Sequence, residues 1–219
     1  MPAFADPSDP LPSVQWPLPQ PWPQGTGRLR LAVMASGNGS NFEALVQASR
    51  QGPLAADVVL LVVNNPGCGA IARAERLGVP WQLHDHRSHA DRRSLDAALI
   101  ACFQAAQVEL VALAGWMRIV TPLLIDAFPG RLINIHPSLL PSFRGVDAVG
   151  QALAAGVAIS GCTAHLVAEE VDSGRILAQA AVPVLPNDTA ASLATRIHVQ
   201  EHRILPLAVA LAAQRLAQG

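Results

Sequence analysis

The sequence predicts an α/β fold in which a mostly parallel, twisted sheet carries helices on both faces. Two observations lead to this class: short, continuously apolar runs alternate with helical stretches, and the composition supplies a large core. Hydrophobic residues make up 51% of the 219 residues and charged residues 14%. This length fits one sizeable domain.

The elements from residue 28 to residue 135 follow this alternation in order. The expected strands cover residues 29–34, 57–63, a short stretch after Pro80, 110–114 and 132–135. The expected helices run from the glycine-rich turn to residue 49, and then over residues 70–77, 91–107 and 122–127. Buried strands that are separated by helices indicate a parallel sheet, because each crossover lays a helix on one face.

The pattern changes after Gly161. The apolar runs at 162–167 and 176–184 have no helix between them, so we expect an antiparallel pair at the edge of the sheet. The remainder of the chain from residue 190 has the pattern of one long helix, with Asp188 or Thr189 as its cap. Functional residues are expected at the carboxyl ends of the strands, where open α/β sheets bind their ligands.

Residues 1–27 are expected to form a flexible extension ahead of a single domain over residues 28–219. The extension is rich in proline, which excludes helices and central strands, while Trp16 and Trp22 can pack locally. It lacks the basic start and unbroken apolar core of a signal peptide.

Charge and hydropathy exclude two classes of partner. The formal net charge is −1 and no basic stripe is present, which argues against nucleic acid. No apolar stretch approaches the ~20 residues of a membrane span. The dispersed Cys68, Cys102 and Cys162 form no disulfide framework and are typical of the reducing cytoplasm. Small molecules remain as the expected partners of a monomer or homodimer.

A glycine-rich turn, Ser36-Gly37-Asn38-Gly39-Ser40-Asn41, joins the first strand to the first helix. Backbone N–H groups and the helix dipole favour an anion at such a junction. The dinucleotide fingerprint fails because Phe42 stands at its third glycine, and the Walker pattern fails because no lysine follows. The turn therefore predicts a cradle for a single phosphate, with a ligand-free tight turn as the alternative.

Asn134, His136 and Asp172 form the candidate catalytic group. Asn134 and His136 lie two residues apart in a strand, so both side chains point to one side, and Pro137 ends the strand. Asp172 lies in the loop between the last two strands, within reach of both. An amide or an imidazolium stabilises the oxyanion of an acyl transfer, and a histidine paired with a carboxylate moves protons. The structural alternative is a turn-forming asparagine and a buried histidine.

Two histidine groups suggest metal chemistry instead. His198, Glu201 and His202 match the HxxEH pattern of some zinc peptidases, but no third carboxylate ligand is placed. The sequence His84-Asp85-His86 with His89 lies in a polar loop without cysteines, where solvated side chains are the usual state. No metal is therefore expected.

Taken together, the motifs resemble the glycinamide ribonucleotide formyltransferases of purine synthesis, within the folate-dependent formyltransferase superfamily. The resemblance runs from Arg28 onward, and its most specific string is the Asn-x-His-Pro-Ser-Leu-Leu-Pro sequence. The motifs are Ser36-Gly37-Asn38-Gly39-Ser40-Asn41, Leu113-Ala114-Gly115-Trp116-Met117-Arg118-Ile119, Asn134-Ile135-His136-Pro137-Ser138-Leu139-Leu140-Pro141, Gly161-Cys162-Thr163-Ala164-His165, Asp172-Ser173-Gly174 and Gln200-Glu201-His202.

The resemblance implies a Rossmann-like formyltransferase fold and transfer of a formyl group from 10-formyltetrahydrofolate to the amine of 5-phosphoribosylglycinamide. It makes Asn134, His136 and Asp172 the catalytic trio and His165 a residue that lines the site. The substrate would bind at Gly39, Ser40, Asn41 and Glu201. The folate would bind at Arg92, Met117, Arg118, Ile119, Val120, Ala168, Glu169, Glu170, Val171 and Asp172.

Two related activities compete with this interpretation. Methionyl-tRNA formyltransferases need a further C-terminal domain with a basic face, and 10-formyltetrahydrofolate hydrolases normally carry an N-terminal regulatory domain. A non-enzymatic binding module accounts for the phosphate cradle and leaves the trio unexplained. The sequence departs from the family pattern at Arg144-Gly145, where Pro-Gly is usual, and at Arg175, where proline is usual.

Overall fold

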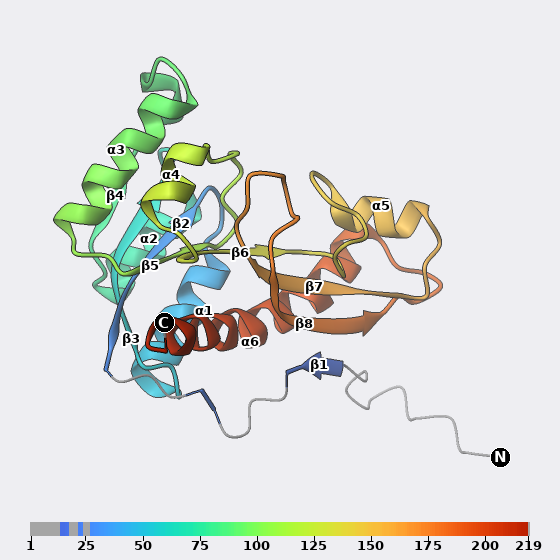
Figure 1. Cartoon of the computed structure of the whole chain (residues 1–219). Coiled ribbons are helices and arrows are strands. Elements are labelled where there is room, and N and C mark those ends of the chain that lie inside the picture. Colours follow the sequence, from blue (N-terminus) through green and yellow to red (C-terminus); the bar gives the residue numbers. More distant parts are fainter. Residues whose placement is uncertain (1–13, 18–21, 24–26, 219) are drawn as a thin grey trace.

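Eight strands form one mixed sheet in the computed structural model, which describes residues 14–17, 22–23 and 27–218 (Figure 1). The strands are β1 (Val14–Trp16), β2 (Leu29–Ala35), β3 (Ala56–Val63), β4 (Trp81–Leu83), β5 (Leu110–Leu113), β6 (Leu132–His136), β7 (Ile159–Leu166) and β8 (Ile176–Pro183). Their order across the sheet is β1-β8-β7-β6-β5-β2-β3-β4. The pairs among β2 to β6 are parallel, and β6 to β8 and β1 are antiparallel.

Helices cover both faces of the sheet and produce two buried cores. The α-helices are α1 (Ser40–Gln51), α2 (Gly69–Leu77), α3 (Arg92–Ala105), α4 (Pro122–Ala127), α5 (Ala148–Ala154) and α6 (Ala190–Leu216). Leu31 and Val33 of β2 face the core under α1, α2 and α6, whereas Ala32 and Met34 face the core under α3 and α4. Because neighbouring residues of a strand bury opposite faces, the strand is continuously apolar.

The sheet confirms the predicted fold class and the antiparallel pair after Gly161. The pair does not form the edge of the sheet, however, because Val14–Trp16 adds β1 outside β8. This short run lies between prolines, and an edge strand tolerates proline at its ends because one side of it makes no ladder hydrogen bonds. Residues 1–13, 18–21 and 24–26 of the predicted extension lie outside the described residues. The domain boundary at residue 28 remains a prediction.

The helix ends follow local signals in the sequence. Thr189 caps α6 by accepting a hydrogen bond from the backbone N–H of Ser192, as the sequence predicts, and Asp91 caps α3 in the same way. The predicted long C-terminal helix is present, although it contains Pro206. The sequence did not predict α5, whose cap residue Asp147 adopts a left-handed conformation. None of the described helices is long and apolar enough to cross a membrane.

Candidate active site

The predicted trio meets at the carboxyl end of β6, where the sheet changes from parallel to antiparallel. Asp172 Oδ2 lies 3.3 Å from His136 Nδ1, and Asp172 Oδ1 accepts a hydrogen bond of 3.3 Å from Asn134 Nδ2. The side chains of His136 and Asp172 are only 7% and 8% exposed. Because little water reaches these groups, their mutual electrostatic interactions are strong.

His136 has an oxygen acceptor at each ring nitrogen. Its Nε2 lies 2.8 Å from the carbonyl oxygen of Phe143, and its Nδ1 faces the Asp172 carboxylate. An imidazole that is protonated at both nitrogens satisfies both contacts, whereas either neutral tautomer leaves one nitrogen lone pair facing an oxygen. The geometry therefore suits an imidazolium. The sequence did not reveal the Phe143 carbonyl, which lies in the loop after β6.

Asp172 is held as a carboxylate by several donors. Burial raises its pKa, but a hydrogen bond with His165, the backbone N–H of Gly145 and the charges of His136 and His165 outweigh burial and lower it below 3.8. Gly145 N donates to Oδ2 over 2.8 Å. Asp172 itself has a left-handed φ of 52°, a conformation that is uncommon outside glycine and enriched among asparagine and aspartate. The loop thus aims this carboxylate at β6.

His165 lies beside the trio, where the sequence predicted a residue that lines the site. It is the β7 partner of Asn134 in the antiparallel register, and its side chain is 2% exposed. His165 Nδ1 lies 2.9 Å from the Leu166 carbonyl oxygen, while Nε2 lies 3.1 Å from Asn134 Nδ2 and 3.5 Å from Asp172 Oδ1. The Asn134 amide is therefore held between His165, its partner in the sheet register, and Asp172.

The predicted phosphate cradle forms a tight turn between β2 and α1. Gly39 has a left-handed φ of 78°, and a Cβ at this position would lie 2.7 Å from the Cα and Cβ of Ala70. Only glycine fits both requirements. The first backbone N–H groups of α1 have no carbonyl partner within the helix, so they are available to an anion.

Three of the four polar side chains in this turn bind protein groups. The Ser36 hydroxyl accepts from the Met117 backbone N–H over 2.8 Å. Asn38 Oδ1 accepts from Arg73 over 2.7 Å, and Asn41 Nδ2 donates to Glu201 over 2.7 Å. In the described part of the chain, Ser40 alone of the four has a side chain without a hydrogen bond. The backbone and Ser40 thus remain for a ligand.

Glu201 projects from α6 into the space behind the turn, where it is 4% exposed. Burial raises its pKa, and the hydrogen bond from Asn41 and the charges of His198 and His136 oppose that shift without reversing it. The hydrogen bond with Asn41 places Glu201 next to the predicted phosphate cradle.

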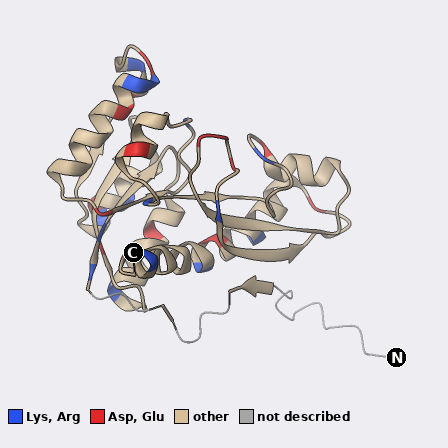
Figure 2. Cartoon of the chain, viewed as in Figure 1, with Lys and Arg blue, Asp and Glu red and all other residues tan. Residues whose placement is uncertain are grey.

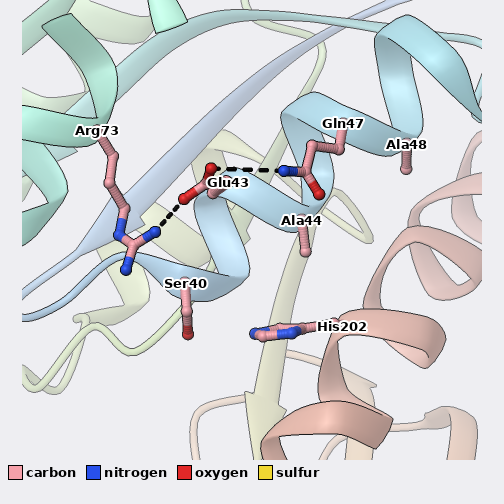
Figure 3. Close-up of a pocket in the computed structure, with 7 residues that line it drawn as sticks. All are labelled: Ser40, Glu43, Ala44, Gln47, Ala48, Arg73 and His202. Atoms are coloured by element: carbon pink, nitrogen blue, oxygen red, sulfur yellow. Dashed lines mark hydrogen bonds and ion pairs between the residues drawn. The ribbon is translucent and has the colours of Figure 1, made fainter. Parts of the chain in front are cut away.

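A cavity of about 410 Å³ opens beside Ser40, between α1, α2 and α6 (Figure 3). Arg73 forms an ion pair with Glu43 at its wall, and the His202 ring faces the start of α1. Its lining residues are Ser40, Glu43, Ala44, Gln47, Ala48, Arg73 and His202. The sequence did not single out Glu43 or Arg73, because their pairing depends on how α1 and α2 pack.

The predicted folate residues fall into two groups. Arg92 and Arg118 line one cavity of about 280 Å³ together with His86, His89, Ala90, Asp91 and Leu95. Met117 and Ile119 are 77% and 53% exposed near this cavity, whereas Val120 is buried. Ala168, Glu169, Glu170 and Val171 form the acidic loop between β7 and β8, which is red in Figure 2.

The two histidine groups lie after β4 and on α6. Within the described ranges, no group of three or more His, Cys, Asp or Glu side chains is placed to hold a metal ion. His84 and His89 stack at 6.4 Å between ring centroids, and Asp85 caps a short 3₁₀ helix at His86–Ser88. In the HxxEH segment, Glu201 is bound to Asn41.

Arg144 lies beside the site but points to solvent. Its guanidinium forms an ion pair of 3.0 Å with Glu170, and the two side chains are 40% and 75% exposed. This pair connects the loop after β6 to the loop after β7. Arg175 is also exposed, so both departures from the family pattern lie at the surface.

Known proteins of similar sequence and structure identify the family of this chain. The chain is 44% identical over 177 residues to phosphoribosylglycinamide formyltransferase of Bacillus subtilis, covering 81% of this chain and 91% of that protein. It is 42% identical over 193 residues, 88% of this chain, to the trifunctional purine biosynthetic protein adenosine-3 of Gallus gallus, of which it spans 19%. The crystal structure of glycinamide ribonucleotide transformylase 1 from Symbiobacterium toebii superposes with a TM-score of 0.84 at 43% identity, covering 86% of this chain and 89% of that chain. The formyl transferase family model matches residues 29–209, and the chain therefore belongs to the formyl transferase family.

Proposed function

We propose that this enzyme transfers a formyl group from 10-formyltetrahydrofolate to the amine of 5-phosphoribosylglycinamide. The observation that carries the proposal is the buried contact of Asp172 with both His136 and Asn134. Two relatives are named for this activity or for glycinamide ribonucleotide transformylation. The amine would attack the formyl carbon directly, without a covalent enzyme intermediate.

The trio suits each stage of this attack. As the new C–N bond forms, the formyl oxygen gains negative charge, which the Asn134 amide and the His136 imidazolium stabilise. Asp172 orients the imidazole through Nδ1 and remains a carboxylate, since its pKa lies below 3.8. Collapse breaks the bond between the formyl carbon and folate N10, and the proton lost by the amine passes to N10.

The substrate phosphate would bind the backbone N–H groups at residues 39–41 and the Ser40 hydroxyl, with Glu201 on the ribose. 10-Formyltetrahydrofolate supplies the formyl group as a co-substrate. Its flat ring would lie by the acidic loop at Ala168 to Asp172 and by Met117 to Val120. Arg92 and Arg118, which line one cavity, would receive its glutamate carboxylates. We expect this chemistry in the cytoplasm, by a monomer or a homodimer.

An absorbance assay of folate deformylation tests the proposal. Purified protein is mixed with a 10-formyl folate, with and without the ribonucleotide and with and without a chelator. Deformylation that requires the ribonucleotide and ignores the chelator supports the transferase. Deformylation without any acceptor would instead identify a 10-formyltetrahydrofolate hydrolase, and loss of activity with the chelator would contradict the metal-free mechanism.

A further inference from the structure

Asn41 and Glu201 are 160 positions apart in the sequence and meet where α1 packs against α6. Asn41 Nδ2 donates to Glu201 Oε2 over 2.7 Å, and the two residues are 8% and 4% exposed. A buried carboxyl group without a donor is costly, and Asn41 donates a hydrogen bond to Glu201. The contact therefore determines where the Glu201 carboxyl group points.

The carbonyl oxygen of the Asn41 side chain offers no contact to a phosphate. Oδ1 is buried and has no hydrogen-bond partner among the residues that the structure describes. It is also an acceptor, so phosphate oxygens would be repelled and not bound. The backbone N–H of Asn41 differs, because it lies in the first turn of α1 without a partner in the helix.

The other groups around Glu201 do not replace Asn41. His198 lies on the same helix, His136 approaches from β6 and Cys162 from β7. Burial raises the pKa of the Cys162 thiol, and the nearby charge of Glu201 raises it further. This thiol therefore stays protonated and offers at most a weak hydrogen bond.

We propose that Asn41 is a positioning residue, whose side chain orients Glu201 toward the ribose hydroxyls and does not bind the phosphate. The inference rests on the proposed function, because it takes the ribonucleotide as the ligand of this site. It divides the turn into two parts. Backbone N–H groups and the Ser40 hydroxyl receive the phosphate, and the Asn41 side chain acts only through Glu201.

The test compares KM for the ribonucleotide with inhibition by inorganic phosphate in Asn41→Ala, Glu201→Ala and the double variant. Asn41→Ala should raise KM by about tenfold, the loss expected for one hydrogen bond to a charged group. The phosphate inhibition constant should stay within about twofold of the wild-type value, because the substitution retains the backbone N–H groups and the Ser40 hydroxyl. In the Glu201→Ala background, Asn41→Ala should add almost nothing to KM.

Several results would overturn the inference. Asn41 is a phosphate ligand if Asn41→Ala raises the phosphate inhibition constant in parallel with KM. Additive effects on KM in the double variant, or a wild-type KM in Glu201→Ala, would show that Asn41 does not act through Glu201. Asn41→Leu, which nearly preserves the side-chain volume, should reproduce Asn41→Ala and replaces it if the alanine variant unfolds. Thermal unfolding of each variant checks its fold.

Failure of the proposed function looks different from failure of this inference. A wild-type enzyme that neither binds nor formylates the ribonucleotide, measured by calorimetry and by turnover, would refute the function. The inference alone fails when the wild-type enzyme is active and the variants behave additively.

A pH series adds a second readout, because loss of the Asn41 donor removes one contact that holds the pKa of Glu201 down. The acidic rise of KM should therefore begin at a higher pH in Asn41→Ala.

Discussion

Removing the charge of Asp172 should slow the reaction by orders of magnitude. His136 Nδ1 and Asp172 Oδ2 are 3.3 Å apart, and both side chains are more than nine-tenths buried. At an effective dielectric constant of about 20, two unit charges at this separation interact by roughly 5 kcal/mol. Without this interaction the imidazolium beside the developing oxyanion is less stable, so Asp172→Asn lowers kcat by a factor of roughly 10³ to 10⁴. The substitution preserves side-chain volume, so folding should be nearly intact.

The assay measures kcat for formyl transfer with both substrates saturating, alongside thermal unfolding of the same preparation. Asp126→Asn is the matched control, since Asp126 is exposed on α4, which carries no residue of the trio, and the substitution removes the same charge. The control should retain wild-type turnover. A folded Asp172→Asn enzyme with more than about a tenth of the wild-type kcat would refute the electrostatic argument.

Three further substitutions test other parts of the structure. Gly39→Ala should lower the free energy of unfolding by roughly 2 kcal/mol or more, because φ is 78° and the added Cβ meets Ala70, whereas Gly37→Ala meets nothing within 4 Å. Urea unfolding of both variants measures this, and equal stabilities would contradict it. Burial, followed by the charges of His198 and Arg73, lowers the pKa of His202 below 6.5. The contribution of His202 to the free energy of unfolding is therefore fully present above pH 6.5. It is lost as the pH falls through the folded pKa, since the unfolded chain takes up the proton first. His202→Gln should reduce this loss in melting curves between about pH 5 and 7.5; an unchanged slope would exclude it. Arg144→Ala should leave kcat within about threefold, because an exposed ion pair contributes little, and a larger steady-state effect would show that the pair orders the loops.

The fold was predictable where local pattern and tertiary structure agree. The strand at 57–63 is a buried apolar run ended by a turn, and the structure has it at Ala56–Val63. The helix α5 was missed because it is short and contains Gly150, which lowers helix propensity. Its position depends instead on packing against α6. Likewise, β1 forms because β8 offers a free edge. No residue within Val14–Trp16 predicts that β8 is the partner strand.

The candidate site was predictable where strand geometry alone decides it. Asn134 and His136 share a face because strand side chains alternate, and the structure brings Asp172 to both. The partners of the glycine turn were not predictable. Asn38 binds Arg73 of α2 and Asn41 binds Glu201 of α6, and such contacts depend on how three helices meet. Residue types suggested anion binding, whereas packing decides which polar atoms remain free.

The change from parallel to antiparallel pairing explains why the trio lies on β6. Parallel β5 supports one edge of this strand, and antiparallel β7 supports the other, so Asn134 stands directly opposite His165. Two of the three trio members therefore have positions fixed by ladder hydrogen bonds. Asp172 is the exception, since a loop in a left-handed conformation carries it and the N–H of Gly145 holds it. Sequence changes in the two loops should consequently alter the position of the carboxylate, and thereby the rate, while the backbone positions of Asn134 and His136 in β6 are retained.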